Sequence, residues 1–263
     1  MGKIRFLLAL SVITAHCGPI LGLELLSAEA VQAFFVISGF YMALVLNEKY
    51  IGANWSYKLF ITNRYLRVAP VYWAVLVLTI LFSFVVGVYR NWIMWPILSS
   101  YQMVNPGFVS FGYLILTNIF IFGQDLVVLL GIDPASGELF FTTNFWNTNP
   151  PLYSFLFLPQ AWTLGLELSF YLIAPFLLRK GFVRVVLFMT ISVAVRLLVF
   201  FYFGLRNDPW SYRFFPSELF FFLLGYFSYR IYLFIKNKST PRYINLALLY
   251  LLLAFTVTFS FLP

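Results

Sequence analysis

The chain has 263 residues, of which 62% are hydrophobic, 22% are aromatic and only 10% are charged. Soluble globular domains average about 25% charged residues, so this composition excludes a soluble domain and predicts a helical protein that crosses a lipid bilayer several times. A single cysteine, Cys17, excludes a disulfide framework, and the net charge of +8 indicates basic loops on one side of a membrane rather than nucleic-acid binding.

The first apolar run, at about residues 4–23, contains the only histidine of the chain. Arg5 and His16 are close to three helical turns apart, so they share one helical face at a separation of about 16 Å. If Arg5 marks a membrane surface, His16 lies near the middle of the bilayer, where an ionisable side chain is costly and indicates a function. The alternative is structural: Arg5 anchors the helix, and a neutral His16 bonds to a carbonyl of a neighbouring helix.

Two further helices are expected at about residues 28–46 and 64–88. The first contains Ser38 and Gly39, which are small enough to permit the close approach of another helix. The second begins with Arg64 and Arg67, which are one turn apart and share a helical face. Such a basic pair indicates either ordinary anchoring at the cytoplasmic surface or a binding site for an anionic ligand.

Residues 91–160 are the most difficult stretch to assign. Residues 111–130 are apolar enough to span a membrane, but Gln124 and Asp125 interrupt them, and residues 138–159 are too polar and proline-rich to provide a second crossing. One crossing alone would move every later basic cluster to the outer side. We therefore expect an outer-side segment that is interfacial or partly re-entrant and that lies over the bundle like a lid.

The remainder of the chain predicts four more helices, which makes about seven in an all-α polytopic membrane protein. Their expected ranges are residues 161–178, 182–205, 214–235 and 243–263. With a cytoplasmic N-terminus, only Arg90, Arg206 and Arg213 lie outside and Arg196 lies within a span, which leaves 13 of the 17 basic residues inside. The reverse orientation inverts this bias, so we reject it.

Two ionisable side chains fall deep inside these later helices. Glu167 lies about 10 Å into its helix from the outer side, and Arg196 lies about 21 Å from the cytoplasmic end of the next helix. A lone charge at such a depth is unfavourable, so we expect Arg196 to pair with Glu167 or with Glu218. Glu167 is preferred because a short turn joins the two helices, and the pair would hold Glu167 ionised on the outer side of a site.

Five motifs together resemble the acyltransferase 3 family of membrane O-acyltransferases. They follow the family's order and cover most of the chain: Arg5-x10-His16, FFVISGF at 34–40, NRYLRVAP at 63–70, AWTLGLELSFYLIAP at 161–175 and PSELFFFLLGY at 216–226. The resemblance implies about ten membrane-spanning helices. Because about seven are expected here, residues 1–263 read as a single membrane-embedded domain that is incomplete at its C-terminus.

The resemblance also implies a reaction and its participants. An acyl group, often acetyl, passes from a cytoplasmic acyl-CoA to a hydroxyl of a cell-surface carbohydrate or lipid-linked glycan, at the plasma or inner membrane and without a metal. The implied catalytic residues are His16 and Glu167. The implied donor-binding residues are Arg5, Arg64 and Arg67. The expected substrate-binding residues are Ser38, Trp162 and Tyr171 and, from its depth in the helix rather than from a motif, Arg196.

The residues themselves fit this chemistry. Guanidinium groups at the cytoplasmic mouth can bind the donor's phosphates, and a neutral imidazole can take the proton of an attacking hydroxyl. The rival hypothesis is a proton-coupled transporter or channel with His16 and Glu167 as a relay, and a third is a structural scaffold. The transporter hypothesis gives no reason for the basic pair, Arg64 and Arg67, and the scaffold hypothesis leaves three buried charges unexplained. Covalent transfer from labelled acetyl-CoA distinguishes the three.

Overall fold

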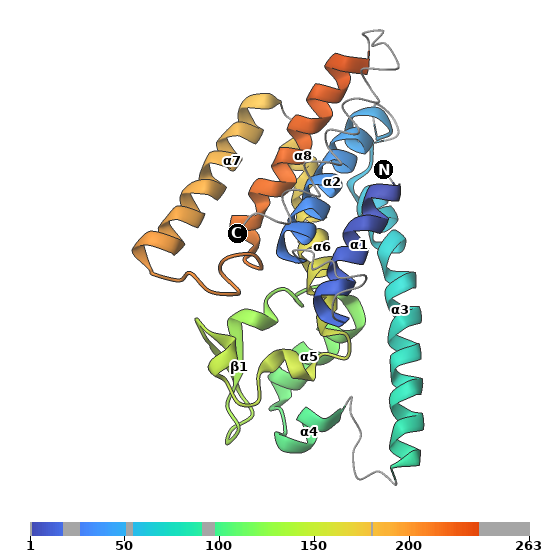
Figure 1. Ribbon diagram of the computed structural model, residues 1–263, viewed down its shortest axis with the longest axis vertical. Helices are drawn as coiled ribbons and strands as arrows, with labels where there is room; N and C mark the ends of the chain where they lie inside the picture. Colours follow the sequence, from blue (N-terminus) through green and yellow to red (C-terminus); the bar gives the residue numbers. More distant parts are fainter. Residues whose placement is uncertain (1, 18–26, 51–54, 91–97, 180, 237–263) are drawn as a thin grey trace.

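The computed structural model describes residues 2–17, 27–50, 55–90, 98–179 and 181–236. Its long helices run alternately down and up in Figure 1: α1 (Gly2–Cys17), α2 (Ser27–Glu48), α3 (Tyr57–Tyr89), α6 (Trp162–Leu178), α7 (Phe182–Leu197) and α8 (Phe215–Lys236). A π-helical turn, Leu198–Tyr202, extends α7. In the described residues, five helices (α2, α3, α6, extended α7 and α8) are long and apolar enough to cross a membrane.

These helices confirm a mostly helical membrane protein, whereas the expected count of seven and the orientation remain predictions. The expected helix at residues 4–23 coincides with α1 over its described part, and the one at residues 243–263 lies outside the described residues. Helix α3 begins at Tyr57 rather than near residue 64. The polar first turns hid its start, which is capped where the Ser56 hydroxyl accepts a hydrogen bond from the Leu59 N–H at 3.2 Å.

Because the helices alternate, charges gather at the ends of the bundle. We call the upper end of Figure 1, where α2 and α8 end and α3 and α7 begin, the basic end, and the opposite end the lid end. The described basic residues in or next to the helix termini at the basic end are Arg5, Lys49, Lys58, Arg179, Arg184 and Lys236. This clustering is the one that the sequence predicts for a cytoplasmic face.

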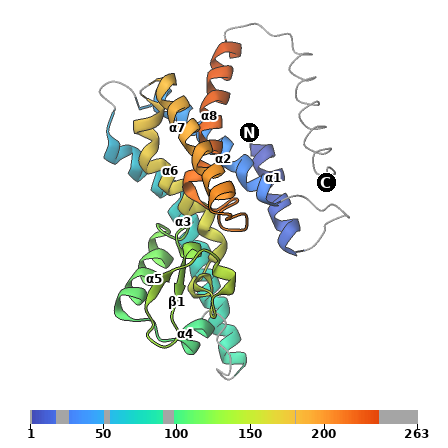
Figure 2. The ribbon, with the colours of Figure 1, turned by 90° about the vertical axis from the view of Figure 1, so that its left-hand side faces the viewer.

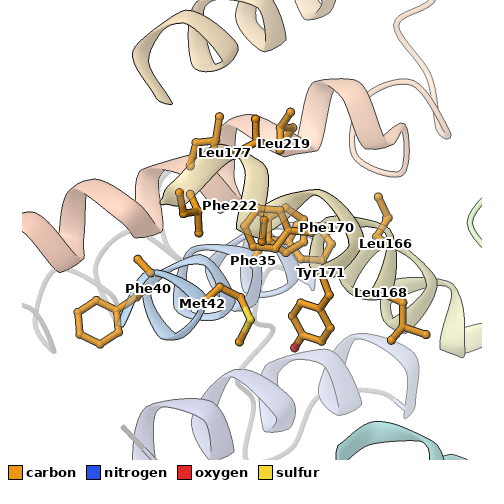
Figure 3. Packing of buried hydrophobic residues seen from close by; sticks show 14 of the residues in the cluster. Phe35, Phe40, Met42, Leu166, Leu168, Phe170, Tyr171, Leu177, Leu219 and Phe222 are labelled. Carbon is orange, nitrogen blue, oxygen red and sulfur yellow. The ribbon is translucent and has the colours of Figure 1, made fainter. Parts of the chain in front are cut away.

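Helices α2 and α8 cross in direct backbone contact. A Cβ atom added at Gly39 would collide with the Phe222 carbonyl of α8, and one added at Gly225 would collide with the Val36 carbonyl of α2. The close approach expected at Ser38 and Gly39 is therefore confirmed. Beside the crossing, the Phe222 ring lies between the rings of Phe35 and Phe170, with centroid distances of 4.6 and 4.3 Å (Figure 3). This stack joins α2, α6 and α8.

Residues 98–161, here called the connecting segment, form no membrane-length helix. Helix α4 (Ser99–Met103) precedes α5 (Phe108–Phe120), whose 13 residues extend about 20 Å and are too short for a hydrocarbon layer of about 30 Å. An unexpected antiparallel pair of short strands follows, β1 (Leu130–Ile132) with β2 (Leu139–Phe141). The apolar run at residues 111–130 thus breaks after α5 and forms no continuous helix of membrane-spanning length. Its re-entrant or interfacial position remains a prediction.

The connecting segment is attached to the bundle through Asn118, at the end of α5. The Asn118 carbonyl accepts a hydrogen bond from the Tyr72 hydroxyl at 2.6 Å, and its side-chain oxygen accepts one from the Phe157 N–H at 2.7 Å. The indole of Trp73 donates to the Ile119 carbonyl at 2.8 Å. The bonds from Tyr72 and Trp73 hold the segment beside α3 at the lid end, as both views show (Figure 1, Figure 2), and the bond from Phe157 joins two parts of the segment itself.

Candidate active site

Glu167 is the centre of a hydrogen-bonded cluster between α2 and α6. The Ser38 hydroxyl of α2 donates to Glu167 Oε1 at 2.5 Å, and the Tyr171 hydroxyl, one turn further along α6, donates to the same oxygen at 2.5 Å. Both donors are buried. Two O–H donors on one carboxylate oxygen make charge-assisted bonds that fix the carboxylate in one orientation. The sequence placed these three residues in the site, and the structure brings them together.

Arg64 is the cation of this cluster. Its side chain is only 7% exposed and lies close enough to interact electrostatically with the Tyr171 hydroxyl. Its Nε and Nη1 atoms are buried without a hydrogen-bond partner among the described residues. A buried guanidinium with open donors is unfavourable unless an anion joins it. The cluster therefore offers a ready position for the negative charge of a ligand.

The cluster faces the helix that carries the Arg5-x10-His16 pattern. In Figure 3 the Tyr171 hydroxyl is directed away from the phenylalanine stack and toward α1. The Arg5 guanidinium lies 4.9 Å above the ring of Tyr41 on α2, and its Nε atom has no hydrogen-bond partner in the described structure. His16 lies in α1, but its side chain is outside the described part, so its role remains a prediction.

Two predicted site residues lie apart from the cluster. Arg67 is exposed although its neighbour Arg64 is buried, so the two guanidinium groups are in different environments. Trp162 lies about 140° around α6 from Glu167. Its ring faces the Arg213 guanidinium, which lies 4.5 Å from the ring centroid. The structure therefore groups Trp162 with the connection between α7 and α8.

The preferred partner of Arg196 was wrong. Its Nη1 atom lies 3.3 Å from Glu218 Oε1, and its Nη2 atom donates to the Ser211 carbonyl at 2.8 Å. The alternative partner, Glu218, is thus confirmed, and the Glu167 carboxylate instead accepts hydrogen bonds from Ser38 and Tyr171. The reason is helix packing: α7 lies along α8, while the Glu167 face of α6 turns toward α2. The expected pairing of Arg196 and Glu167 on the acceptor side is corrected accordingly.

A buried carboxylate that sequence reasoning missed lies in the turn after α5. Asp125 is 5% exposed, and its Oδ1 atom has no hydrogen-bond partner among the described residues. Burial raises the pKa of Asp125 to about 6, so the carboxyl is mostly ionised at neutral pH. The signal in the sequence is the polar pair Gln124 and Asp125 within an apolar run, which by itself indicates only an interrupted span.

The site has no visible metal-binding arrangement within the described residues, where no group of three His, Cys, Asp or Glu side chains is placed to hold an ion. The chemistry available is that of hydroxyl, carboxylate and guanidinium groups around Glu167. These groups can bind an anionic ligand and stabilise a positive charge that develops nearby.

Comparison with known proteins identifies the family to which the sequence is matched. The sequence model of the acyltransferase 3 family, described as an acyltransferase domain, matches residues 4–263. The match covers all five motifs, including those that supply Arg64 and Glu167. No curated protein and no solved structure matches the chain.

Proposed function

Because the chain belongs to the acyltransferase 3 family, we propose that this membrane acyltransferase moves an acyl group, in the first place acetyl, from acyl-CoA to a hydroxyl of a cell-surface carbohydrate or lipid-linked glycan. The donor approaches from the cytoplasm at the basic end, and the acceptor approaches from the lid end. The protein works in the plasma or inner membrane. With family membership showing an acyltransferase, the transporter hypothesis loses its support.

The observation that supports this proposal most is the buried, incompletely paired Arg64 beside Glu167, Ser38 and Tyr171. A scaffold has no use for open guanidinium donors inside a bundle, because they lower its stability. Acyl-CoA carries phosphates and, during reaction, a negative charge on the thioester oxygen. Arg64 binds this donor charge, and Arg5 supplies a second cation from α1.

His16 acts as the general base in the proposed reaction. Its neutral imidazole takes the proton of the acceptor hydroxyl while the hydroxyl oxygen attacks the thioester carbonyl carbon. The carbon–sulfur bond then breaks, and the departing thiolate of coenzyme A takes the proton back from the imidazolium. The products are the acyl ester and free coenzyme A, so no oxidant or further co-reactant is needed.

Glu167 supports this step by its charge. Ser38 and Tyr171 hold the carboxylate in one position, and the Tyr171 hydroxyl faces the helix that carries His16 (Figure 3). A fixed negative charge near an imidazole stabilises the imidazolium that forms when the base takes a proton. We therefore assign Glu167 to electrostatic stabilisation.

Incubation of membranes with acetyl-CoA and purified envelope glycans tests the proposal. With the label in the acetyl group, we expect label to appear in the glycan and to be released by mild alkali, as an ester is. With the label in the adenine, the glycan stays unlabelled. If neither preparation labels any glycan while the protein is present and inserted, O-acyl transfer to carbohydrate is excluded.

A further inference from the structure

A cavity lies on the far side of α6 from the Glu167 cluster. Its volume is about 300 Å³, and it is bordered by the turn after α5, by α6 and by the beginning of α8. Asp125 and Leu126 line it from the turn, Ser169 lines it from α6, and Arg213 to Phe215 line it from the α8 side. Ser169 is two residues beyond Glu167, which is about 200° around the helix. The helix itself thus separates the two sites.

Asp125 gives this cavity an open hydrogen-bonding group. Its side chain is more than nine-tenths buried, and Oδ1 lacks a partner in the described structure. A buried carboxylate oxygen without a donor is unfavourable. The turn is pressed against α6 at Gly165, where an added Cβ would lie 3.0 Å from Asp125 Oδ1. The close contact holds Oδ1 against α6 and fixes the carboxylate group at the cavity wall, where a ligand can donate to its other oxygen.

Arg213 supplies the opposite charge in the same cavity. It is held in place by an ion pair from its Nε to Asp208 Oδ1 at 2.8 Å and by a hydrogen bond from Nη2 to the Tyr212 hydroxyl at 2.6 Å. Its guanidinium also lies 4.5 Å from the centroid of the Trp162 ring. The cavity therefore presents a guanidinium that is paired with Asp208 and a buried carboxylate from Asp125 to the same ligand.

The combination of groups selects the chemistry of the occupant. Arg213 disfavours a cationic ligand and Asp125 disfavours an anionic one, because like charges repel at short range. The walls next to them are apolar and aromatic, from Leu126, Phe214 and Phe215. A ligand that is neutral, rich in hydroxyl groups and apolar on its ring faces satisfies all three features. The volume is at the lower limit for small-ligand pockets, about 300 Å³, and suits one ring rather than several.

We propose that this cavity binds one sugar unit of the acceptor, with a sugar hydroxyl donating to Asp125. This inference rests on the proposed function and adds a subsite that is separate from the reacting centre. Because α6 stands between the subsite and Glu167, the bound unit is a neighbour of the acylated sugar rather than the acylated sugar itself. The subsite therefore acts on acceptor affinity and leaves the chemical step unchanged.

Direct binding is the first test. Saturation-transfer NMR on the full chain in detergent uses the methyl glycosides of glucose, galactose, rhamnose and N-acetylglucosamine. We expect signals from at least one glycoside with the wild type, an affinity lower by about tenfold or more in Asp125→Asn, and no binding in Ser169→Leu, which fills the cavity. Ser169→Ala, which keeps the cavity open, should retain measurable binding. Asp133→Asn, at a partly buried carboxylate in the β1–β2 hairpin turn outside this cavity, is the control that keeps wild-type binding.

Transfer kinetics form the second test. In Asp125→Asn we expect the KM for the glycan acceptor to rise about tenfold or more, with the KM for acetyl-CoA and the kcat close to those of the wild type. The subsite is overturned if Asp125→Asn keeps both the wild-type KM for the acceptor and wild-type glycoside binding. It is also overturned if the wild type binds none of the four glycosides. If Asp125→Asn does not fold, comparison of Ser169→Leu with Ser169→Ala decides.

The two tests also separate the subsite from the proposed function. Suppose that the wild type binds a glycoside, that Asp125→Asn loses this binding, and that the wild type acylates no carbohydrate. The proposed function is then excluded and the subsite is retained. Acyl transfer in the wild type with equal glycoside binding in all variants retains the function and overturns the subsite.

Discussion

Ser38, Glu167 and Tyr171 come from two helices yet converge on a single carboxylate oxygen. The two hydroxyl groups differ in origin: Tyr171 is on the same helix as Glu167, one turn away, whereas Ser38 reaches it from α2. The Tyr171 bond therefore orients the carboxylate within α6, and the Ser38 bond ties α6 to α2. Loss of either hydroxyl leaves the other in place, but loss of the carboxylate removes the charge that both of them hold.

Substitution Glu167→Gln should lower kcat by about 10²-fold or more, because the amide keeps the shape of the side chain but cannot stabilise an imidazolium. Ser38→Ala should cost less, about tenfold, because Tyr171 still holds the carboxylate. Initial rates of acetyl transfer at saturating substrates measure both. Equal rates in Glu167→Gln and the wild type contradict the electrostatic role.

Substitution His16→Ala should abolish transfer while expression and membrane insertion stay normal, because removal of a general base typically costs about 10²-fold or more. The measurement is the transfer rate per inserted protein. Cys17→Ala, at the adjacent exposed position, is the matched control and should retain activity. A His16→Ala variant that keeps about a third of the wild-type rate would remove His16 from the role of base.

Substitution Arg64→Lys should weaken acetyl-CoA binding by about tenfold or more, because an ammonium cannot replace a planar guanidinium with several fixed donors. Arg67→Lys is expected to have a smaller effect, since Arg67 is exposed whereas Arg64 is buried. Donor affinity measured in detergent distinguishes them. If both variants bind the donor as tightly as the wild type, the basic pair serves only as a membrane anchor.

At the scale of helices, the contact between α2 and α8 sets the position of Ser38. Gly39 is the next residue and touches the α8 backbone at Phe222, so any shift at this crossing moves Ser38 relative to α6. Association of helices within a membrane depends on such close packing, because lipid tails offer no hydrophobic penalty for separation. The crossing is therefore a structural requirement for the Glu167 cluster.

Substitution Gly39→Leu should lower the melting temperature in detergent by several degrees and impair transfer, because the side chain has no space beside Phe222. Gly112→Ala in α5 is the matched control, since a Cβ there meets nothing within 4 Å. We expect the control to melt near the wild-type temperature. A Gly39→Leu protein that melts at the wild-type temperature would mean that the two helices do not pack closely in the membrane.

The sequence predicted the helices well because apolar runs and their length are local properties. The helix expected at residues 28–46 is α2, at Ser27–Glu48, and the one at 161–178 is α6, at Trp162–Leu178. The partner of Arg196 depended instead on which faces of α6, α7 and α8 meet. One sequence does not define that rotation, so the choice between Glu167 and Glu218 failed.

In the candidate site, too, the residue types were predictable from the sequence, whereas the contacts between helices were not. Ser38, Glu167 and Tyr171 were named from motifs, whereas their shared hydrogen bonds depend on helix packing. Asp125 was missed because its burial arises only when the turn after α5 folds against Gly165 of α6. That contact joins residues 40 positions apart through a segment whose fold no simple period predicted. The strands β1 and β2 were missed for the same reason, since three residues are too few to show an alternating pattern.

At the scale of the whole molecule, the basic end and the lid end differ in charge, and this asymmetry predicts the orientation. Lys58 lies at the start of α3 and Arg206 follows the end of extended α7, and both are exposed. In a Cys17→Ser background, we expect Arg206→Cys to react with a membrane-impermeant maleimide on intact cells. Lys58→Cys should react only after permeabilisation. The opposite labelling pattern would invert the topology and place the donor site outside.

Helix α3 is longer than a membrane is thick. Its 33 residues extend about 50 Å, against about 30 Å of hydrocarbon, and it exposes Leu78, Phe82 and Val85 along its half nearer the lid end. The excess length lies in the polar first turns, which carry Lys58, Arg64 and Arg67, so the apolar remainder of α3 is about as long as the hydrocarbon layer is thick. Tyr72 and Trp73 bind the end of α5, so we expect a change in the tilt of α3 to carry α5 with it. Bilayers of longer or shorter acyl chains, which alter helix tilt, should therefore change the position of the connecting segment relative to α6.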